Sequence, residues 1–359
     1  MRMWDSSRSP SALLQPGNRV RFVTIDDAEL PVHVISDSPT SISDQHTIPP
    51  QEDCDQFKVI TAPFPALFQD FGRSGQSSQG VSASGALDPP SLKAANRVVG
   101  NPVNTPCLEI MPGVFSFESS ARVVIGYAGA PCMVTIQDVR GHTRTVTNLQ
   151  PAAVEPGDVV KFGHANAGVR CYLAVRGGFD VNEVLGSAAT DTLANLGPKP
   201  VTAGRALKLR NSRCNLMSVS LNETSTLILP KAGDVLVLDV VLGPRTEWFT
   251  SKGLETFTQQ QWNVTPDSSR VGIRLSGDIP IERERNDELP SEGTVKGAIQ
   301  VPPTGQPVLF LADHPLTGGY PVIGAVAEHH LDLLGQLPVN TKIRLRPLAP
   351  FSEIVGVLN

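Results

Sequence analysis

Glycine and proline interrupt this chain at short intervals. There are 31 of each among 359 residues, and the runs between them are short and rich in residues that favour strands. Short β-rich runs bounded by turn residues are typical of all-β folds. We therefore expect a mainly β fold with few helices.

A turn followed by a short strand recurs along the chain. Residues 156–162 (PGDVVKF) show the pattern clearly, and related segments occur at 16–22, 232–238 and 338–345. Each predicts a turn before a strand with two different faces. The irregular spacing excludes a solenoid and favours barrel-closing strands in a duplicated fold. The alternative is that the recurrence is due to chance, because a turn followed by a strand is common in any β protein.

Two segments predict helices. In residues 88–100, Asp88 can cap the first turn, two prolines follow it, and Gly100 can end the helix. Residues 250–260 also carry apolar residues on one face, although Gly253 weakens that prediction.

Composition narrows the class of protein. Hydrophobic residues make up 40% and charged residues 18%, which is enough apolar material for globular cores. The net charge of −5 with mixed signs leaves no basic stripe for nucleic acid. The start lacks the apolar stretch of a signal peptide and no 18-residue apolar run occurs, so we expect a cytoplasmic protein without a membrane segment.

The sequence lacks the motifs of several common kinds of functional site. The five cysteines form no CxxC pair, and His329 and His330 stand outside any H-x-x-x-H pattern, so we predict no metal site. Ser84 stands where a G-x-S-x-G elbow needs glycine, so a serine hydrolase is not indicated. There is no P-loop and no biotinyl-lysine phrase.

The chain is expected to begin with an appendage. Residues 26–56 are rich in Asp, Ser, Pro and Thr, which is the composition of a linker. The main body should therefore start near Phe57.

Seven phrases in the body carry a family resemblance. They are residues 69–75 (QDFGRSG), 80–88 (GVSASGALD), 95–101 (ANRVVGN), 168–178 (GVRCYLAVRGG), 186–191 (GSAATD), 297–303 (GAIQVPP) and 317–321 (TGGYP). Together they resemble the biotin-dependent carboxyltransferase family, which includes allophanate hydrolase subunit 2, the C subunit of 5-oxoprolinase and the carboxyltransferase region of urea carboxylase. The resemblance runs from about residue 57 to residue 348.

The resemblance implies an architecture and a partner. It predicts two cyclophilin-like β-barrel domains, at 57–238 and 239–359, with a few short helices and an appendage at 1–56. Within that appendage, residues 11–22 resemble the end of a partner subunit. The implied partner is the homologous smaller subunit, which is allophanate hydrolase subunit 1 or the B subunit of 5-oxoprolinase.

The resemblance also implies chemistry on an amide or urea-like carbonyl. The first expectation is the C subunit of an ATP-dependent 5-oxoprolinase, a hydrolase of carbon–nitrogen bonds that works within a complex. The alternatives are a urea-carboxylase-type carboxyltransferase and a non-enzymatic regulator that binds the smaller subunit. We expect no covalently bound cofactor. ATP would act through the complex, and biotin would arrive on another protein.

Three residues are candidates for proton transfer. Imidazole as a side-chain type titrates near neutrality, which makes His314 one candidate, and the adjacent Asp313 could raise its basicity, although successive strand residues point to opposite faces. Glu292 is a second candidate acid or base. The alternatives are a hydrogen-bonded corner histidine and a solvated loop carboxylate.

Eight further residues are candidates for substrate binding. Arginine can grip a carboxylate with two hydrogen bonds, a glutamine amide complements another amide, and glycines let backbone approach a ligand. Surface salt bridges and a tight turn are the alternatives. The candidates are Asp70, Arg73, Arg270, Gln300, Thr317, Gly318, Gly319 and Tyr320.

The last predicted strand departs from the family pattern. Val339 stands where a turn glycine is expected.

Overall fold

The computed structural model describes residues 12–14, 18–20, 55–210, 216–225 and 227–348. The chain divides into two compact units, Met1–Cys54 and Asp55–Asn359. Most of the predicted appendage lies outside the described residues, and of residues 11–22 only 12–14 and 18–20 are described.

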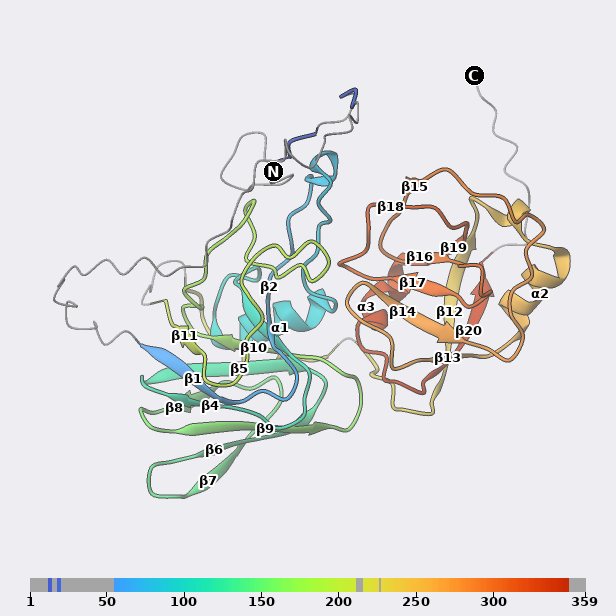
Figure 1. Cartoon of the computed structure of the whole chain (residues 1–359). Coiled ribbons are helices and arrows are strands. Elements are labelled where there is room, and N and C mark those ends of the chain that lie inside the picture. Colours follow the sequence, from blue (N-terminus) through green and yellow to red (C-terminus); the bar gives the residue numbers. More distant parts are fainter. Residues whose placement is uncertain (1–11, 15–17, 21–54, 211–215, 226, 349–359) are drawn as a thin grey trace, which may run out of the picture. The chain divides into compact units, whose positions relative to one another are not determined.

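The first half of the body consists of two antiparallel sheets (Figure 1). Its strands are β1 (Gln56–Thr61), β2 (Leu67–Gln69), β3 (Cys107–Ile110), β4 (Phe115–Ser119), β5 (Val123–Gly129), β6 (Cys132–Gln137), β7 (Thr143–Val146), β8 (Ala152–Val154), β9 (Val159–Ala165), β10 (Cys171–Val175) and β11 (Ala206–Lys208). One sheet has the order β11-β1-β4-β9-β6-β7 and the other β2-β3-β10-β5-β8. Both sheets contribute to one apolar core, in which Phe57 and Phe117 stack with ring centroids 4.3 Å apart.

The second half forms a closed barrel. The order is β12-β19-β16-β17-β14-β13-β20, and a parallel pairing of β12 with β20 closes it. Its strands are β12 (Val235–Leu242), β13 (Trp262–Val264), β14 (Gly272–Ser276), β16 (Ala298–Gln300), β17 (Val308–Phe310), β19 (Val322–Val326) and β20 (Lys342–Pro347). β15 (Glu292–Gly293) and β18 (Thr317–Gly318) make a separate two-stranded sheet. The mainly β prediction is confirmed.

Short helices complete the body. They are η2 (Ser77–Gln79), α1 (Pro89–Val99), η3 (Thr246–Trp248), α2 (Ser251–Gln259), η4 (Glu328–His330) and α3 (Leu331–Leu334).

Both predicted helices are confirmed, and their caps explain their ends. The Asp88 carboxylate accepts the backbone N–H of Ser91 at 3.0 Å before α1, and Gly100 ends that helix with φ +71°. In α2, a Cβ on Gly253 would lie 2.3 Å from the carbonyl oxygen of Glu282. The glycine that weakens the helix prediction is therefore required by close packing.

The turn-and-strand phrases also mark real strands, since β9, β12 and β20 follow the predicted turns. Asn340 has φ +70°, so it takes the left-handed conformation for which a glycine was expected at Val339. The predicted domain boundary between residues 238 and 239 falls inside β12, all of which pairs within the barrel.

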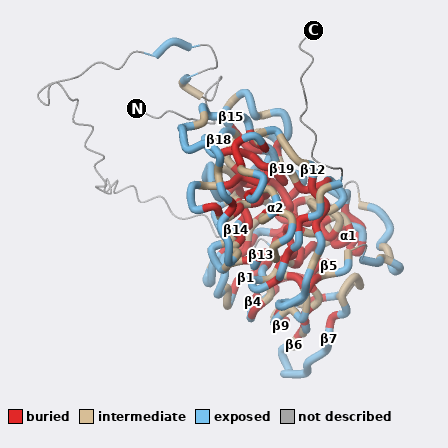
Figure 2. The backbone as a smooth tube through the Cα atoms, turned by 90° about the vertical axis from the view of Figure 1, so that its right-hand side faces the viewer, coloured by how far each residue is buried: buried red, intermediate tan, exposed pale blue. Residues whose placement is uncertain are grey.

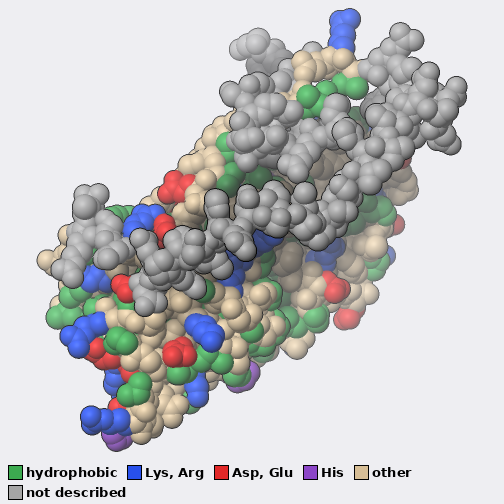
Figure 3. Space-filling view, turned by 60° about the vertical axis from the view of Figure 1, so that its left-hand side comes forward, with side chains coloured by type: hydrophobic (Ala, Val, Ile, Leu, Met, Phe, Trp, Pro, Cys, Tyr) green, Lys and Arg blue, Asp and Glu red, His purple; other side chains and the backbone are tan. Residues whose placement is uncertain are grey.

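Burial follows the strands. Figure 2 shows buried backbone within the sheets and exposed backbone at connections such as the β6–β7 turn. On the face drawn in Figure 3, basic and acidic side chains are interspersed, as the mixed charge of the sequence predicts.

One apolar residue ties the halves together. Leu87, which precedes α1 in the first half, is fully buried and belongs to the core of the second half.

Candidate functional site

Asp70 organises a turn. It follows β2, and its carboxylate accepts the N–H of Gly72 at 2.8 Å, the hydroxyl of Ser187 at 2.6 Å and the N–H of Ala188 at 2.8 Å. These three donors fasten the β2 turn to the segment that starts at Ser187. Asp70 is 4% exposed, and because its carboxylate is occupied by these donors, its role is to hold the backbone near Gly72 and Ala188 in place.

Arg73 is held in the same place by carbonyl groups. Its Nε donates to Val184 at 3.2 Å, and its Nη2 donates to the carbonyl of Ala189. The side chain is 2% exposed, and its Nη1 has no hydrogen-bond partner among the described residues. Burial lowers the pKa of Arg73, although the charges of Asp191 and Asp70 oppose this effect.

Gln69, at the end of β2, has one side-chain atom bonded and the other without a partner in the described part of the chain. Its Nε2 donates to the carbonyl of Thr190 at 2.9 Å, while its buried Oε1 has no partner among the described residues. Arg73 and Gln69 therefore bind the consecutive carbonyls of Ala189 and Thr190, and each keeps one polar atom unused. One atom is a donor and the other an acceptor.

Asp313 is fully buried and completely hydrogen-bonded. Its Oδ1 accepts from Ser84 at 2.7 Å and from Nη2 of Arg270 at 3.1 Å. Its Oδ2 accepts the N–H and hydroxyl of Thr192 at 2.9 and 2.8 Å and Nε of Arg270 at 3.0 Å. Burial raises the pKa of Asp313, but the charge and hydrogen bonds of Arg270 outweigh burial, so the net pKa lies below the ordinary value.

Arg270 lies in a buried ion pair and not in a surface salt bridge, and its role in substrate binding stays a prediction. It is 5% exposed, grips Asp313, and donates through Nη1 to Glu109 and through Nη2 to the carbonyl of Gly85, both at 2.6 Å. Burial lowers the pKa of Arg270, but the charges of Glu109 and Asp313 outweigh it and raise the pKa overall. Arg270 does bind a carboxylate with two hydrogen bonds, as predicted for a substrate, but that carboxylate is the side chain of Asp313.

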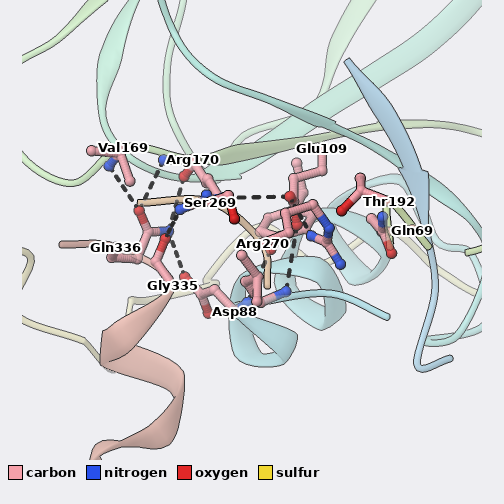
Figure 4. Close-up of polar contacts among 12 residues, drawn as sticks. Gln69, Asp88, Glu109, Val169, Arg170, Thr192, Ser269, Arg270, Gly335 and Gln336 are labelled. Carbon is pink, nitrogen blue, oxygen red and sulfur yellow. Dashed lines mark hydrogen bonds and ion pairs between the residues drawn. The ribbon is translucent and has the colours of Figure 1, made fainter. Parts of the chain in front are cut away.

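The network continues across the two halves (Figure 4). The hydroxyl group of Tyr172 donates to the Glu109 carboxylate at 2.8 Å. The same hydroxyl oxygen accepts the backbone N–H of Asp88 at 2.9 Å. Gln336 donates to the Asp88 carboxylate at 2.7 Å and accepts the N–H groups of Val169 and Arg170, both at 3.0 Å. First-half strands are thus joined to the barrel by buried polar contacts.

His314 faces different surroundings from Asp313. Its Nδ1 lies 2.8 Å from the carbonyl oxygen of Pro315, and its ring stacks on Phe310. Because a carbonyl only accepts, Nδ1 is the donor in this contact. The prediction that Asp313 assists His314 is wrong, since the Asp313 carboxylate bonds instead to Arg270, Ser84 and Thr192. A catalytic role for His314 stays a prediction.

Glu292 is an ion-pair partner. It accepts Nε of Arg245 at 3.0 Å and also Nη2 of the same residue. These hydrogen bonds lower the pKa of Glu292. In the β15–β18 pair Glu292 lies opposite Gly318, and Thr317 lies opposite Gly293. Its acid or base role stays a prediction.

Gln300 and Tyr320 are neighbours. The Gln300 amide donates to the backbone carbonyl of Tyr320 at 2.9 Å, and a Cβ on Gly318 would lie 2.6 Å from that amide nitrogen. The glycine thus allows a close approach, but to a protein side chain. Gly319 is exposed, and the Tyr320 ring lies under Arg283 at 5.9 Å.

Sequence reasoning missed several residues of the network. Ser84, Asp191 and Thr192 lie in or beside phrases that carry the family resemblance, which is the signal that could have identified them. Gln336 follows α3 and has no such signal, although it is fully buried. No helix among the described residues is long and apolar enough to cross a membrane.

Comparisons with known proteins place these observations in a family. A family model described as "Carboxyltransferase domain, subdomain A and B" matches residues 79–347. The chain is 32% identical over 290 residues to the C subunit of 5-oxoprolinase from Escherichia coli, covering 80% of this chain and 89% of that protein. It is 30% identical over 307 residues to the urea amidolyase of Saccharomyces cerevisiae, covering 78% of this chain and 16% of the relative.

A solved structure supports the same assignment. The K. lactis urea amidolyase matches with a TM-score of 0.72 at 28% identity, over 82% of this chain and 19% of that one. The chain thus spans about a fifth of that enzyme's length. With the family model, the relatives and the fold in agreement, this chain belongs to the family of carboxyltransferase domains with subdomains A and B, and it is homologous to the C subunit of 5-oxoprolinase and to part of urea amidolyase.

Proposed function

We propose that this chain is the C-type subunit of a 5-oxoprolinase-like assembly that acts on the carbon–nitrogen bond of a small amide. The proposal includes a homologous smaller subunit as its partner. Support comes from the match to the E. coli 5-oxoprolinase C subunit, which covers 80% of this chain and 89% of that protein.

The observation that carries the chemistry is that Nη1 of Arg73 and Oε1 of Gln69 each lack a hydrogen-bond partner among the described residues, while the two side chains bond to the consecutive carbonyls of Ala189 and Thr190. An amide offers a carbonyl oxygen that accepts and an N–H that donates. Nη1 of Arg73 can donate to the carbonyl, and Oε1 of Gln69 can accept the N–H. Two buried polar atoms without partners are costly unless water or a ligand satisfies them.

The positive charge of Arg73 gives this pair a role beyond binding. Attack on an amide carbonyl moves negative charge onto oxygen, and a fixed donor at that oxygen stabilises the change. The carbonyls of Val184 and Ala189 hold the guanidinium, and Asp70 holds the segment that carries Ala189. We propose no covalently held cofactor. ATP would be used through the complex.

Carboxyl transfer to urea is the second candidate. The observation that favours it is the similarity to urea amidolyase, and urea presents the same carbonyl and N–H groups as an amide. This reaction would need biotin carried on another protein.

The test is reconstitution. The chain is assayed alone, with its smaller homologous subunit, and with the third 5-oxoprolinase subunit, for ATP hydrolysis that depends on 5-oxoproline. Turnover only in the full mixture supports the first proposal, and carboxylation of urea by added carboxybiotin supports the second. A stable complex without either reaction indicates regulatory binding and contradicts both.

Variants connect the activity to the site. Arg73→Lys keeps the charge but removes Nη1 together with the Nε and Nη2 donors to Val184 and Ala189, and we expect turnover to fall about 100-fold, as for loss of an oxyanion donor. The control is Arg122→Lys, because Arg122 forms an exposed ion pair with Glu155. An unchanged rate in a folded Arg73→Lys protein contradicts the proposed role.

A further inference from the structure

Three side chains that commonly bind metal ions meet beside β12. Asp239 comes from that strand, and His329 and His330 come from η4. One ligand atom from each of the three lies within 4.8 Å of the other two. The sequence does not reveal this cluster, because Asp239 precedes the two histidines by about ninety residues.

The carboxylate divides its two oxygens between different partners. Oδ1 accepts Nε of Arg346 at 2.6 Å, while Oδ2 lies 2.9 Å from Nε2 of His329. The Asp239 side chain is 9% exposed and that of His329 is 59% exposed. One ligand is therefore anchored in the protein, and the other faces solvent from which an ion can enter.

His330 is fixed more tightly than His329. The backbone N–H of Asp239 donates to Nδ1 of His330 at 3.0 Å, and the two imidazole rings lie 4.3 Å apart. A metal ion would compete with this amide for the lone pair of Nδ1. His330 should therefore contribute less to binding than His329.

We propose that Asp239, His329 and His330 bind one Zn²⁺ or a similar first-row divalent ion. Imidazole and carboxylate suit these ions, whereas Mg²⁺ and Ca²⁺ prefer oxygen alone. Two ligand atoms on a tetrahedral zinc, each at about 2.1 Å, lie roughly 3.4 Å apart. Oδ2 and Nε2 need to separate by only a few tenths of an ångström to admit the ion. The charge of Arg346 opposes a cation, so the site should bind more weakly than a closed structural zinc site.

A bound ion would fasten a segment that joins the halves of the body. η4 continues into α3 and then to Gln336, which bonds to Asp88 and Arg170 of the first half. An ion that binds only the folded chain raises its melting temperature by mass action. Thermal stability therefore gives a readout that is independent of any enzymatic activity.

The experiment uses the full chain without an affinity tag, after treatment with a chelator. Zn²⁺ is titrated by calorimetry, and the melting temperature is followed with and without Zn²⁺. We expect one ion per chain and a rise in melting temperature. His329→Ala should lower the affinity at least about tenfold, and His330→Ala should lower it less.

The matched control is His142→Ala. His142 and Asp138 form another exposed histidine–aspartate pair, at 3.0 Å. Because His329 is largely exposed, His329→Ala should fold, which circular dichroism will verify. Absence of binding by the unmodified chain, or equal affinity in His329→Ala and the unmodified chain, would overturn the proposal.

Discussion

Asp313→Asn should destabilise the protein strongly without changing the shape of the side chain. The aspartate accepts five hydrogen bonds and pairs with buried Arg270. Asparagine has one acceptor oxygen and turns an NH₂ group toward donors that need an acceptor. Breaking a buried ion pair on one side costs about 3–5 kcal/mol. We expect about 3 kcal/mol, since Arg270 keeps Glu109 and Gly85.

The assay is equilibrium unfolding in guanidinium at neutral pH, with the free energy of unfolding compared between the two proteins. The matched control is Asp287→Asn, because Asp287 pairs with Arg285 at the surface and its loss should change little. A loss below about 1 kcal/mol for Asp313→Asn would refute the reasoning that this buried ion pair, with its bonds to Ser84 and Thr192 of the first half, contributes strongly to stability.

The pH dependence gives a second measurement on the same variant. The pKa of Asp313 lies below its ordinary value in the folded chain. Its contribution to stability is therefore complete above the unfolded-state pKa of about 3.9, and it is lost as pH falls through the lower folded-state pKa. Asp313→Asn should lack this part of the acid destabilisation.

Three further predictions concern the fold. Leu87→Ala should lower the free energy of unfolding by about 2–5 kcal/mol, because the residue fills the core of the second half, and a loss under about 1 kcal/mol would contradict that placement. Asn340→Gly should be nearly neutral and Asn340→Ala should cost about 1 kcal/mol in thermal melts, since φ is +70°, and equal stability of the two variants would argue against this conformation. Burial raises the pKa of Cys107, so a thiol reagent should label it only in denaturant, as followed by peptide mass analysis, and labelling of the native chain would show that it is accessible.

Local sequence signals predicted the elements whose causes are local. α1 follows from Asp88 and the prolines after it, and Gly100 ends it where expected. The turn-and-strand phrases predicted β9, β12 and β20 for the same reason. The domain boundary at 238/239 stays a prediction that came from the family resemblance, since local signals do not reveal which barrel a strand will join.

The partners of the candidate site residues could not be predicted, because they lie far apart in the chain. Asp313 and Arg270 are both candidates of the sequence analysis, but sequence adjacency suggested His314 as the partner of Asp313. The actual partners of Asp313 include Ser84, 229 residues away, and Thr192, 121 residues away. Tertiary packing alone determines such pairs.

The most direct test of the amide proposal is a crystal structure of the reconstituted complex with a slowly reacting cyclic amide. The account predicts the ligand carbonyl about 2.7–3.2 Å from Nη1 of Arg73 and the ligand N–H at a similar distance from Oε1 of Gln69. A water molecule bound to both atoms, with the amide held elsewhere, would contradict it.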